Sequence, residues 1–303
     1  MPADRVIPTD AIVHAVAFTS DGALVGACGD RQVRVWDLAT GKAKLTLPLV
    51  EGDRVADLPA ASDVLATIGK DGQLKTWNLQ TGKVGVRLPG STPRTSDLAV
   101  SPDRRFLVSS ERVAGNGSEE IVHIWETTDA RERVQIPGGI GGTATIAISP
   151  DNSIVVASSY DANVRAWNSR NGELLSLIEQ LPVTMFAMAF SPDGKTLATG
   201  GADRIIYLWD TKTWKLKTQF AGQREMISAL AYSPNGKLLL TGGFNAITVK
   251  HPVDVILREA ASGKVVRTVP AAHRVASVAF SPDGKLAAFT DGQKSVSLLN
   301  IVG

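Results

Sequence analysis

Short runs of alternating apolar and polar residues, separated by turn residues, follow one another along the chain. The clearest example is residues 188–220, MAFSPDGKTLATGGADRIIYLWDTKTWKLKTQF, which contain four such runs. Ser191–Gly194 separates the first two runs, Gly201–Asp203 the next two, and the third run ends in Leu208-Trp209-Asp210. Short runs bounded by Gly, Pro, Asp and Ser are typical of strands joined by tight turns. The segment therefore predicts an antiparallel sheet of four strands.

The same unit recurs seven times. The residue pairs that end the third run are Trp36-Asp37, Trp77-Asn78, Trp125-Glu126, Trp167-Asn168, Trp209-Asp210, Leu257-Arg258 and Leu299-Asn300, spaced by 41, 48, 42, 42, 48 and 42 residues. The first turn recurs as TSDG at 19–22, SPDR at 101–104, SPDN at 149–152, SPDG at 191–194, SPNG at 233–236 and SPDG at 281–284, and the second copy has only PAAS at 59–62. The two long spacings predict an insertion of six residues between the second and third runs of copies three and six. Self-similarity at such a period indicates a repeat architecture.

The pattern AFSPDG…LATGG-x-D…LWD resembles the WD-repeat family, in seven copies that cover essentially the whole chain. The resemblance implies an all-β fold, a seven-bladed β-propeller of four-stranded antiparallel blades. We expect one domain over residues 1–303, with blades at about 10–50, 51–90, 91–137, 138–180, 181–221, 222–270, and 271–303 plus 4–8.

In the family, the Trp joins a hydrogen-bonded chain with a Ser or Thr of the second strand, a His before the first strand and an Asp of the turn. The resemblance therefore gives structural roles to Trp36, Trp77, Trp125, Trp167 and Trp209, and to Asp30, Asp71, Asp161 and Asp203, each six residues before a Trp. Thr67, Ser158 and Thr199 are the candidates for the hydroxyl group. The Gly-His pair is missing from nearly every copy: Gly222-Gln223 is its closest likeness, and only His273 comes near it. We therefore expect the blades to depend on packing.

The seventh copy ends after its third run, at Ile301, whereas an additional run precedes the first copy. Pro270 stands ten residues before Phe280, and Pro8 stands ten residues before Phe18. By this match, residues 4–8 are predicted to be the outer strand of the seventh blade. This closure leaves no inner edge unpaired, so truncation of residues 1–9 is expected to cost stability out of proportion to its length.

Composition excludes several classes of protein. The 303 residues are 44% hydrophobic and 20% charged, so the chain can bury a core. The net charge of +2 is too small to indicate a general nucleic-acid binder. The beginning of the chain does not resemble a signal peptide, and no apolar run approaches the roughly 18 residues of a membrane span. We expect a cytoplasmic protein without nucleic-acid or membrane partners, and the abundance of Ala, Arg and SPDG turns would suit a bacterial source.

No catalytic or metal signature stands out. Cys28 is the only cysteine and predicts a small buried side chain, and His14, His123, His251 and His273 lack metal-ligand spacing on one element. The GGIGG at 138–142 precedes a predicted strand, whereas a phosphate-binding loop precedes a helix. We expect no cofactor and no metal. The predicted residues at the channel mouth are His14, Arg54, Ser96, Ala144, Phe186, Ser228 and Ala276, a mostly small or apolar set that argues against an acid–base centre.

The leading hypothesis from the resemblance is a non-enzymatic, monomeric interaction scaffold that binds a protein or peptide. The alternatives are a small-ligand sensor or enzyme that uses the central channel, and a structural domain of a larger chain. Loops before the first strand and between the second and third strands open on one face, called the top face, and both insertions, at about 111–120 and 244–254, belong to it. Loops extended on a rigid scaffold often carry function.

Arginines gather on the predicted top face and suit an acidic partner. The candidate partner-binding residues are Arg31, Arg54, Arg94, Arg204, Arg224 and Arg274, together with His14, Asn116, Tyr160 and Phe244. The alternative is that acidic neighbours neutralise them: Asp30, Asp53, Asp203 and Glu225 stand beside four of these arginines.

Overall fold

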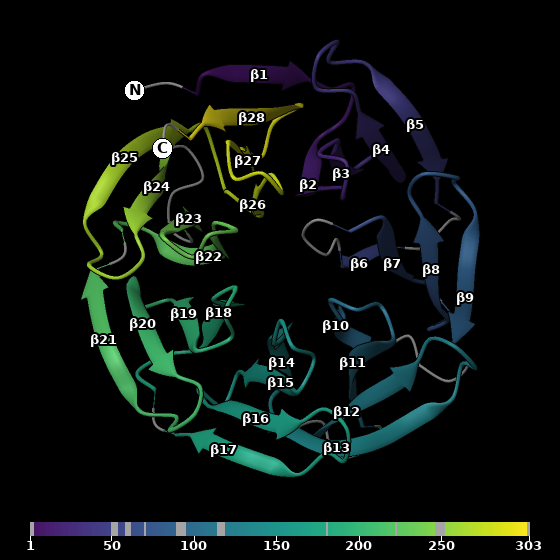
Figure 1. The fold of residues 1–303 in the computed structure, drawn as a ribbon, viewed down its shortest axis with the longest axis vertical. Helices are drawn as coiled ribbons and strands as arrows, with labels where there is room; N and C mark the ends of the chain where they lie inside the picture. The colour runs from purple at the N-terminus through teal and green to yellow at the C-terminus, as the bar shows by residue number, and fades with distance from the viewer. Residues whose placement is uncertain are drawn as a thin grey trace.

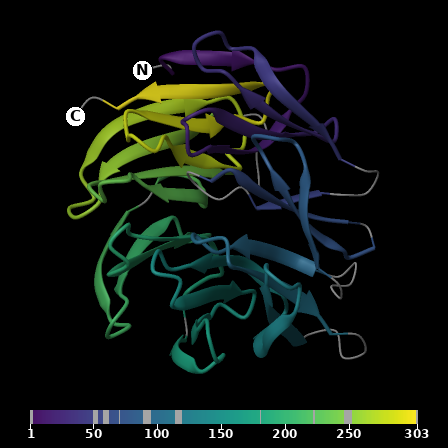
Figure 2. The ribbon, with the colours of Figure 1, turned by 45° about the vertical axis from the view of Figure 1, so that its right-hand side comes forward.

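The computed structural model describes residues 3–49, 54–57, 62–69, 71–88, 95–113, 119–179, 181–221, 223–245 and 252–301. Within these residues, 28 strands form seven antiparallel sheets of four strands each. The sheets stand as blades around a central axis (Figure 1), and the oblique view of Figure 2 shows them following one another around the ring in chain order. The structure therefore confirms the predicted seven-bladed propeller.

Each blade has one strand at each of four radial positions. The innermost strands are β2 (Val13–Phe18), β6 (Arg54–Asp57), β10 (Thr95–Val100), β14 (Thr143–Ile148), β18 (Met185–Phe190), β22 (Met226–Tyr232) and β26 (Val278–Phe280). The second strands are β3 (Leu24–Cys28), β7 (Val64–Ile68), β11 (Phe106–Arg112), β15 (Ile154–Ser159), β19 (Thr196–Gly201), β23 (Leu238–Phe244) and β27 (Leu286–Thr290). The third strands are β4 (Gln32–Trp36), β8 (Leu74–Asn78), β12 (Glu119–Glu126), β16 (Val164–Asn168), β20 (Ile205–Asp210), β24 (Val253–Glu259) and β28 (Ser295–Asn300). The outer strands are β5 (Ala43–Pro48), β9 (Val84–Leu88), β13 (Glu132–Ile140), β17 (Leu174–Ile178), β21 (Leu216–Ala221), β25 (Val265–Ala271) and β1 (Arg5–Pro8).

The core lies in the seams between blades. A second strand such as β3 is buried along its whole length because blades cover both of its faces, whereas the outer strand β21 is mostly exposed. One apolar cluster joins Val156 and Ala166 of blade 4 to Phe190 and Trp209 of blade 5, and comparable clusters fill the other seams. Removal of one blade would therefore expose two apolar faces.

The N-terminal strand β1 closes the ring. It pairs antiparallel with β28, in the register Arg5↔Leu298 to Pro8↔Ser295. Ile7 is buried, and the carboxylate of Asp4 accepts hydrogen bonds from both terminal nitrogens of Arg267, at 2.8 and 2.9 Å, and from the backbone N–H of Asn300, at 2.7 Å. The predicted closure is confirmed, and Asp4 additionally ties the first residues to blade 6.

The strand register corrects the alignment of the sixth copy. Arg258 pairs with Leu239, as Trp209 pairs with Leu197. Arg258 therefore occupies the Trp position of blade 6, and Leu257 points to the other side, into the cluster shared with blade 7. Ser233 precedes Arg258 by 25 residues, whereas Ser191 precedes Trp209 by 18, so the insertion has seven residues rather than six. The sequence favoured Leu257 because arginine is seldom fully buried.

Three of the tryptophans use a hydroxyl group of the second strand. The indole N–H donates from Trp77 to Thr67 at 3.0 Å, from Trp125 to Ser109 at 2.9 Å and from Trp209 to Thr199 at 3.1 Å. The prediction for Ser158 is wrong, because its hydroxyl donates to the carbonyl of Met185 in the next blade. Ala157, one residue earlier, has the register that Thr199 has in blade 5.

Candidate interaction surface on the top face

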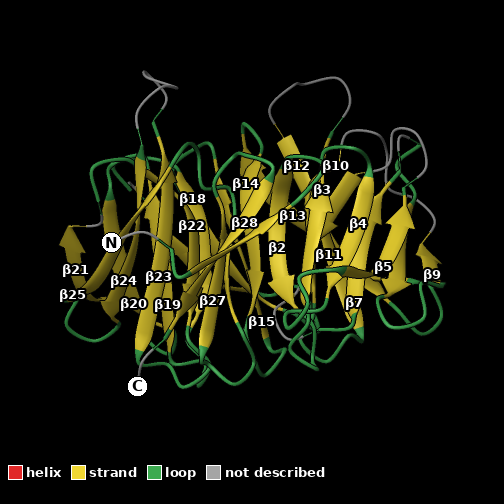
Figure 3. Cartoon of the chain, turned by 90° about the horizontal axis from the view of Figure 1, so that it is seen from above, coloured by secondary structure: helices red, strands yellow, loops and turns green. Residues whose placement is uncertain are grey.

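The strands run between two faces that carry the loops, as the side view in Figure 3 shows. The top face bears the turns between second and third strands and the loops that lead into innermost strands. In three of these turns, the residue after the turn Asp has a left-handed backbone: Arg31 (φ +63°), Ala162 (φ +59°) and Arg204 (φ +68°). A non-glycine residue in this region is held there by the surrounding structure. The exposed side chains of Arg31 and Arg204 therefore project from rigid turns.

The turn aspartates bond to the third strand of their own blade. Asp30 accepts hydrogen bonds from Arg34, and this guanidinium holds the pKa of Asp30 below its usual value. Asp161 accepts one from Arg165 at 2.8 Å. In blade 5, the Tyr207 hydroxyl donates to Asp203 at 2.7 Å, and in blade 6, Thr241 donates to Gln223 at 2.9 Å. Gln223 thus contacts the second-strand hydroxyl in blade 6.

The acids beside the exposed arginines are turned inward. Asp203 faces Tyr207 and not Arg204, and Glu225 is only 9% exposed. Burial raises the pKa of the Glu225 carboxyl, which hydrogen-bonds to the backbone of Asp254. No ion pair joins an acid to Arg204 or Arg224 within the described part of the chain. Their positive charges therefore remain available at the surface.

An aromatic row crosses the top face from blade 4 to blade 7. The ring centroids of Tyr160 and Phe186 are 6.4 Å apart, those of Phe186 and Phe244 are 6.3 Å apart, and the Arg274 guanidinium lies 4.9 Å from the centre of the Phe244 ring. Tyr160 is 54% exposed, Arg274 is exposed, and the two phenylalanines are half-buried. Aromatic residues and arginine dominate the energetic centres of protein interfaces. The row thus combines an apolar surface with an adjacent cation.

The structure brings half of the predicted partner-binding residues into this sector. Tyr160, Phe244 and Arg274 belong to the row, and Arg204 and Arg224 lie on the same face of blades 5 and 6. His14 and Arg31 are exposed on blade 1. The side chain of Arg54, together with Arg94 and Asn116, lies outside the described residues. Sequence analysis placed Phe186 at the channel mouth but missed the row, because its four residues come from four blades.

The two insertions differ in structure. In blade 3, β11 and β12 continue into the predicted loop 111–120, so that Arg112 pairs with Glu120. The insertion there mainly lengthens a hairpin, which corrects the prediction of a long loop. In blade 6, β23 ends at Phe244 and β24 begins at Val253. The row residue Phe244 therefore stands at the base of the second insertion.

Polar groups along the channel connect neighbouring blades. Ser228 donates to the carbonyl of Val275 at 2.7 Å, and the Ser277 hydroxyl donates to the carbonyl of Val16 at 3.1 Å. Asp97 accepts the backbone N–H of Ile146 at 2.8 Å. These bonds bridge blades 6 and 7, 7 and 1, and 3 and 4. These three groups thus carry structural hydrogen bonds.

The described residues hold no cluster of three or more His, Cys, Asp or Glu side chains arranged to bind a metal ion. Cys28 is buried as predicted, and burial raises the pKa of its thiol. A raised pKa leaves little of the reactive thiolate. Among the same residues, no helix is long and apolar enough to cross a membrane.

Comparisons with known proteins agree with this architecture. The family model of the WD domain, G-beta repeat, matches residues 6–37, 141–168, 180–210 and 214–246, which lie in blades 1, 4, 5 and 6 apart from residues 6–8 in the outer strand of blade 7. No curated protein matches the chain. Among 1774 matching chains of solved structures, one from the crystal structure of the mitotic checkpoint complex has a TM-score of 0.83 at 17% identity, covering 100% of this chain and 92% of that one. At this identity the likeness shows the fold alone. The protein is a seven-bladed β-propeller in which four segments match the WD40 repeat model.

Proposed function

We propose that the protein is a non-enzymatic scaffold that binds a protein or peptide through the top face of blades 4–7. The observation that carries this proposal is the continuous row of Tyr160, Phe186, Phe244 and Arg274. Rings held by a rigid propeller lose little conformational freedom on binding, so their contact area contributes efficiently to affinity.

The charges beside the row indicate the chemistry of the partner. Arg204, Arg224 and Arg274 are exposed, and their acidic sequence neighbours Asp203 and Glu225 point inward. A segment with acidic and apolar side chains would match this surface, because guanidinium groups pair with carboxylates in a bidentate geometry. The partner is thus proposed to be acidic, with one or more large apolar residues that pack on Phe186 and Phe244.

The channel alternative has less support. Ser228, Ser277 and Asp97 already make hydrogen bonds between blades, so part of their hydrogen-bonding capacity is used to hold the ring. Among the described residues, the side chain of Tyr160, at the exposed end of the row, makes no such hydrogen bond between blades.

The test compares two triple charge reversals in affinity capture from a lysate of the source organism, followed by identification of the partner. The top-face variant carries Arg204→Glu, Arg224→Glu and Arg274→Glu. The control carries Lys195→Glu, Lys237→Glu and Lys285→Glu, which are exposed lysines on the opposite face of the same three blades and give the same change in net charge.

We expect the top-face variant to lose the partner and the control to retain it. Titration of the purified partner should then show that Phe244→Ala weakens binding by roughly 30-fold, the loss typical of an interface hot spot. Equal capture by both triple variants would overturn the proposal.

A further inference from the structure

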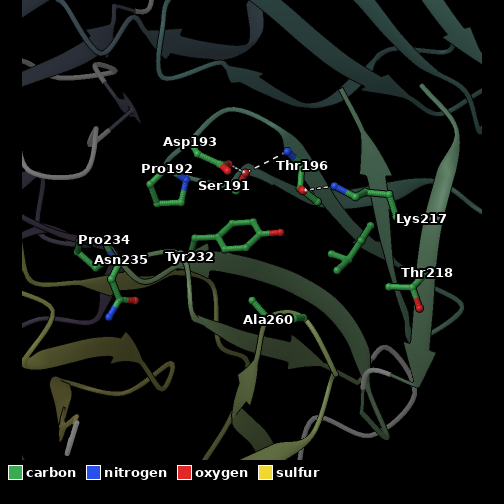
Figure 4. A pocket seen from close by; sticks show the side chains of 13 residues that line it. Ser191, Pro192, Asp193, Thr196, Lys217, Thr218, Tyr232, Pro234, Asn235 and Ala260 are labelled. Carbon is green, nitrogen blue, oxygen red and sulfur yellow. Dashed lines mark hydrogen bonds between the residues drawn. The ribbon is translucent and has the colours of Figure 1, made fainter. Parts of the chain in front are cut away.

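A cavity of about 620 Å³ lies on the bottom face at the seam between blades 5 and 6 (Figure 4). Its walls include Thr196, Leu208 and Lys217 from blade 5, and Tyr232, Pro234 and Ala260 from blade 6. The volume falls within the range of small-molecule sites. The cavity is on the opposite face from the aromatic row, so a ligand there would be independent of the proposed top-face partner.

The same seam contains a buried cation. Arg258 occupies the Trp position of blade 6, and this side of its strand faces blade 5, as Trp209 faces blade 4. Arg258 is only 5% exposed and lies behind the cavity lining, and the strand that carries it leads through Glu259 to Ala260 in the cavity wall.

No carboxylate pairs with Arg258 within the described part of the chain. One terminal nitrogen donates to the carbonyl of Gly263 at 3.3 Å, and Nε is buried without a partner. Removal from water lowers the pKa of this guanidinium. A buried charge without a counter-ion is costly, so an anion that enters the seam would relieve part of that cost.

Two polar groups of the cavity wall can donate hydrogen bonds to the same ligand, and the wall also contains the carboxylate of Asp193, which accepts a hydrogen bond from Ser191 at 2.6 Å. The Lys217 ammonium lies at the rim, 3.1 Å from the Thr196 hydroxyl and 3.7 Å from a carboxylate oxygen of Asp210. The Tyr232 hydroxyl points into the cavity (Figure 4), and no hydrogen bond to it occurs among the described residues. Burial raises the pKa of Tyr232, which keeps the hydroxyl protonated as a donor. Leu208, Pro234 and Ala260 supply apolar walls.

We propose that this seam cavity binds a small organic carboxylate. Its apolar body packs between Leu208 and Pro234, and its carboxylate accepts hydrogen bonds from Tyr232 and Lys217 in the field of Arg258.

The experiment titrates the full chain with three carboxylates (benzoate, 3-phenylpropionate and hexanoate) and with their neutral amides. Chemical shifts or heats of binding report the affinity. At least one carboxylate should bind, and its amide should bind at least tenfold more weakly because it lacks the charge. If no carboxylate of the panel binds, or if each amide binds as well as its acid, the proposal is wrong.

Substitutions distinguish the seam from a general surface effect. Lys217→Met and Tyr232→Phe remove one polar group each while retaining most of the side chain, and each should weaken carboxylate binding several-fold. Lys212→Met is the matched control, because Lys212 is an exposed lysine of the same blade outside the cavity. Arg258→Met should also weaken binding, and its melting temperature checks that the blade remains folded. Unchanged affinity in Lys217→Met, Tyr232→Phe and Arg258→Met would refute the site.

Discussion

Ring closure by β1 can be tested with two adjacent residues that face opposite sides of one strand. Ile7 is 1% exposed and packs into the cluster that joins blades 7 and 1, with Phe18, Ala288 and Leu298 among its members. Val6 is 52% exposed. The pair Ile7→Ala and Val6→Ala therefore changes the same strand once on its buried face and once on its exposed face.

The expected magnitudes differ clearly. Truncation of a fully buried isoleucine to alanine costs about 2–5 kcal/mol, through lost transfer free energy and the residual cavity. An exposed substitution away from special features usually changes stability by less than about 0.5 kcal/mol. At roughly 2 °C per kcal/mol for a large domain, Ile7→Ala should lower the melting temperature by about 4–10 °C, and Val6→Ala should leave it nearly unchanged.

Urea denaturation followed by tryptophan fluorescence measures the loss in the free energy of unfolding. Deletion of residues 1–9 should cost more than Ile7→Ala, since it also removes the Asp4 contacts with Arg267 and Asn300. If Ile7→Ala cost less than about 1 kcal/mol, or no more than Val6→Ala, β1 would not hold the ring closed and the reasoning would be refuted.

Three further substitutions test contacts that the structure reveals. The Arg267 hydrogen bonds lower the pKa of Asp4, so ionised Asp4 stabilises the fold above its unfolded pKa, and this contribution is lost as pH falls through the lower folded pKa. Asp4→Asn should therefore lower the melting temperature at neutral pH but not in acid, and a difference from wild type that is independent of pH would contradict this. Arg104 has φ +65° where most equivalent turns have glycine, so Arg104→Gly should raise the free energy of unfolding by up to about 1 kcal/mol in urea denaturation. The control Arg105→Gly should lower it, and a lower free energy of unfolding in both variants would contradict the strain at Arg104. Arg258→Trp should raise the free energy of unfolding by about 1–4 kcal/mol because an apolar group replaces an unpaired buried charge, and a melting temperature below that of the wild type would contradict this. The same substitution should abolish carboxylate binding at the seam.

The repeat was predictable because its signals are local. Turns such as Ser191–Gly194 combine residues that each favour a turn, and the Ser191 hydroxyl donates to Asp193 at 2.6 Å and accepts the N–H of Thr196 at 3.0 Å. Every bond of this motif lies within six residues of sequence. A single copy therefore specifies its own hairpin, and the count of copies specifies the number of blades.

The alignment of blade 6 was not predictable in the same way. Leu257 and Arg258 are neighbours, and a shift of one residue in a strand exchanges the two faces. The sequence pattern favoured Leu257 at the buried position because leucine is apolar and arginine is charged. Only the pairing of Arg258 with Leu239 shows which side chain faces blade 5. A buried arginine is thus a departure that a hydrophobic pattern cannot reveal.

The top-face row was partly predictable. Tyr160, Phe244 and Arg274 were candidates because the repeat places them in top-face turns and loops. Their mutual contact depends on the rotation from blade to blade and on Phe186, whose ring lies between Tyr160 and Phe244. Tertiary geometry of this kind leaves no local pattern in the sequence.

Blade 6 departs from blades 1–5 at two points that serve no evident need of the fold. It has the longer insertion, and it has Arg258 where blades 1–5 have Trp. A tryptophan with Thr241 beside it would fill the seam as Trp209 and Thr199 do in blade 5. A stabilising residue that is absent while its hydrogen-bonding hydroxyl remains is better explained by a use for the space than by packing. The top-face row passes through the same blade at Phe244, so blades 5 and 6 contribute to both proposed sites.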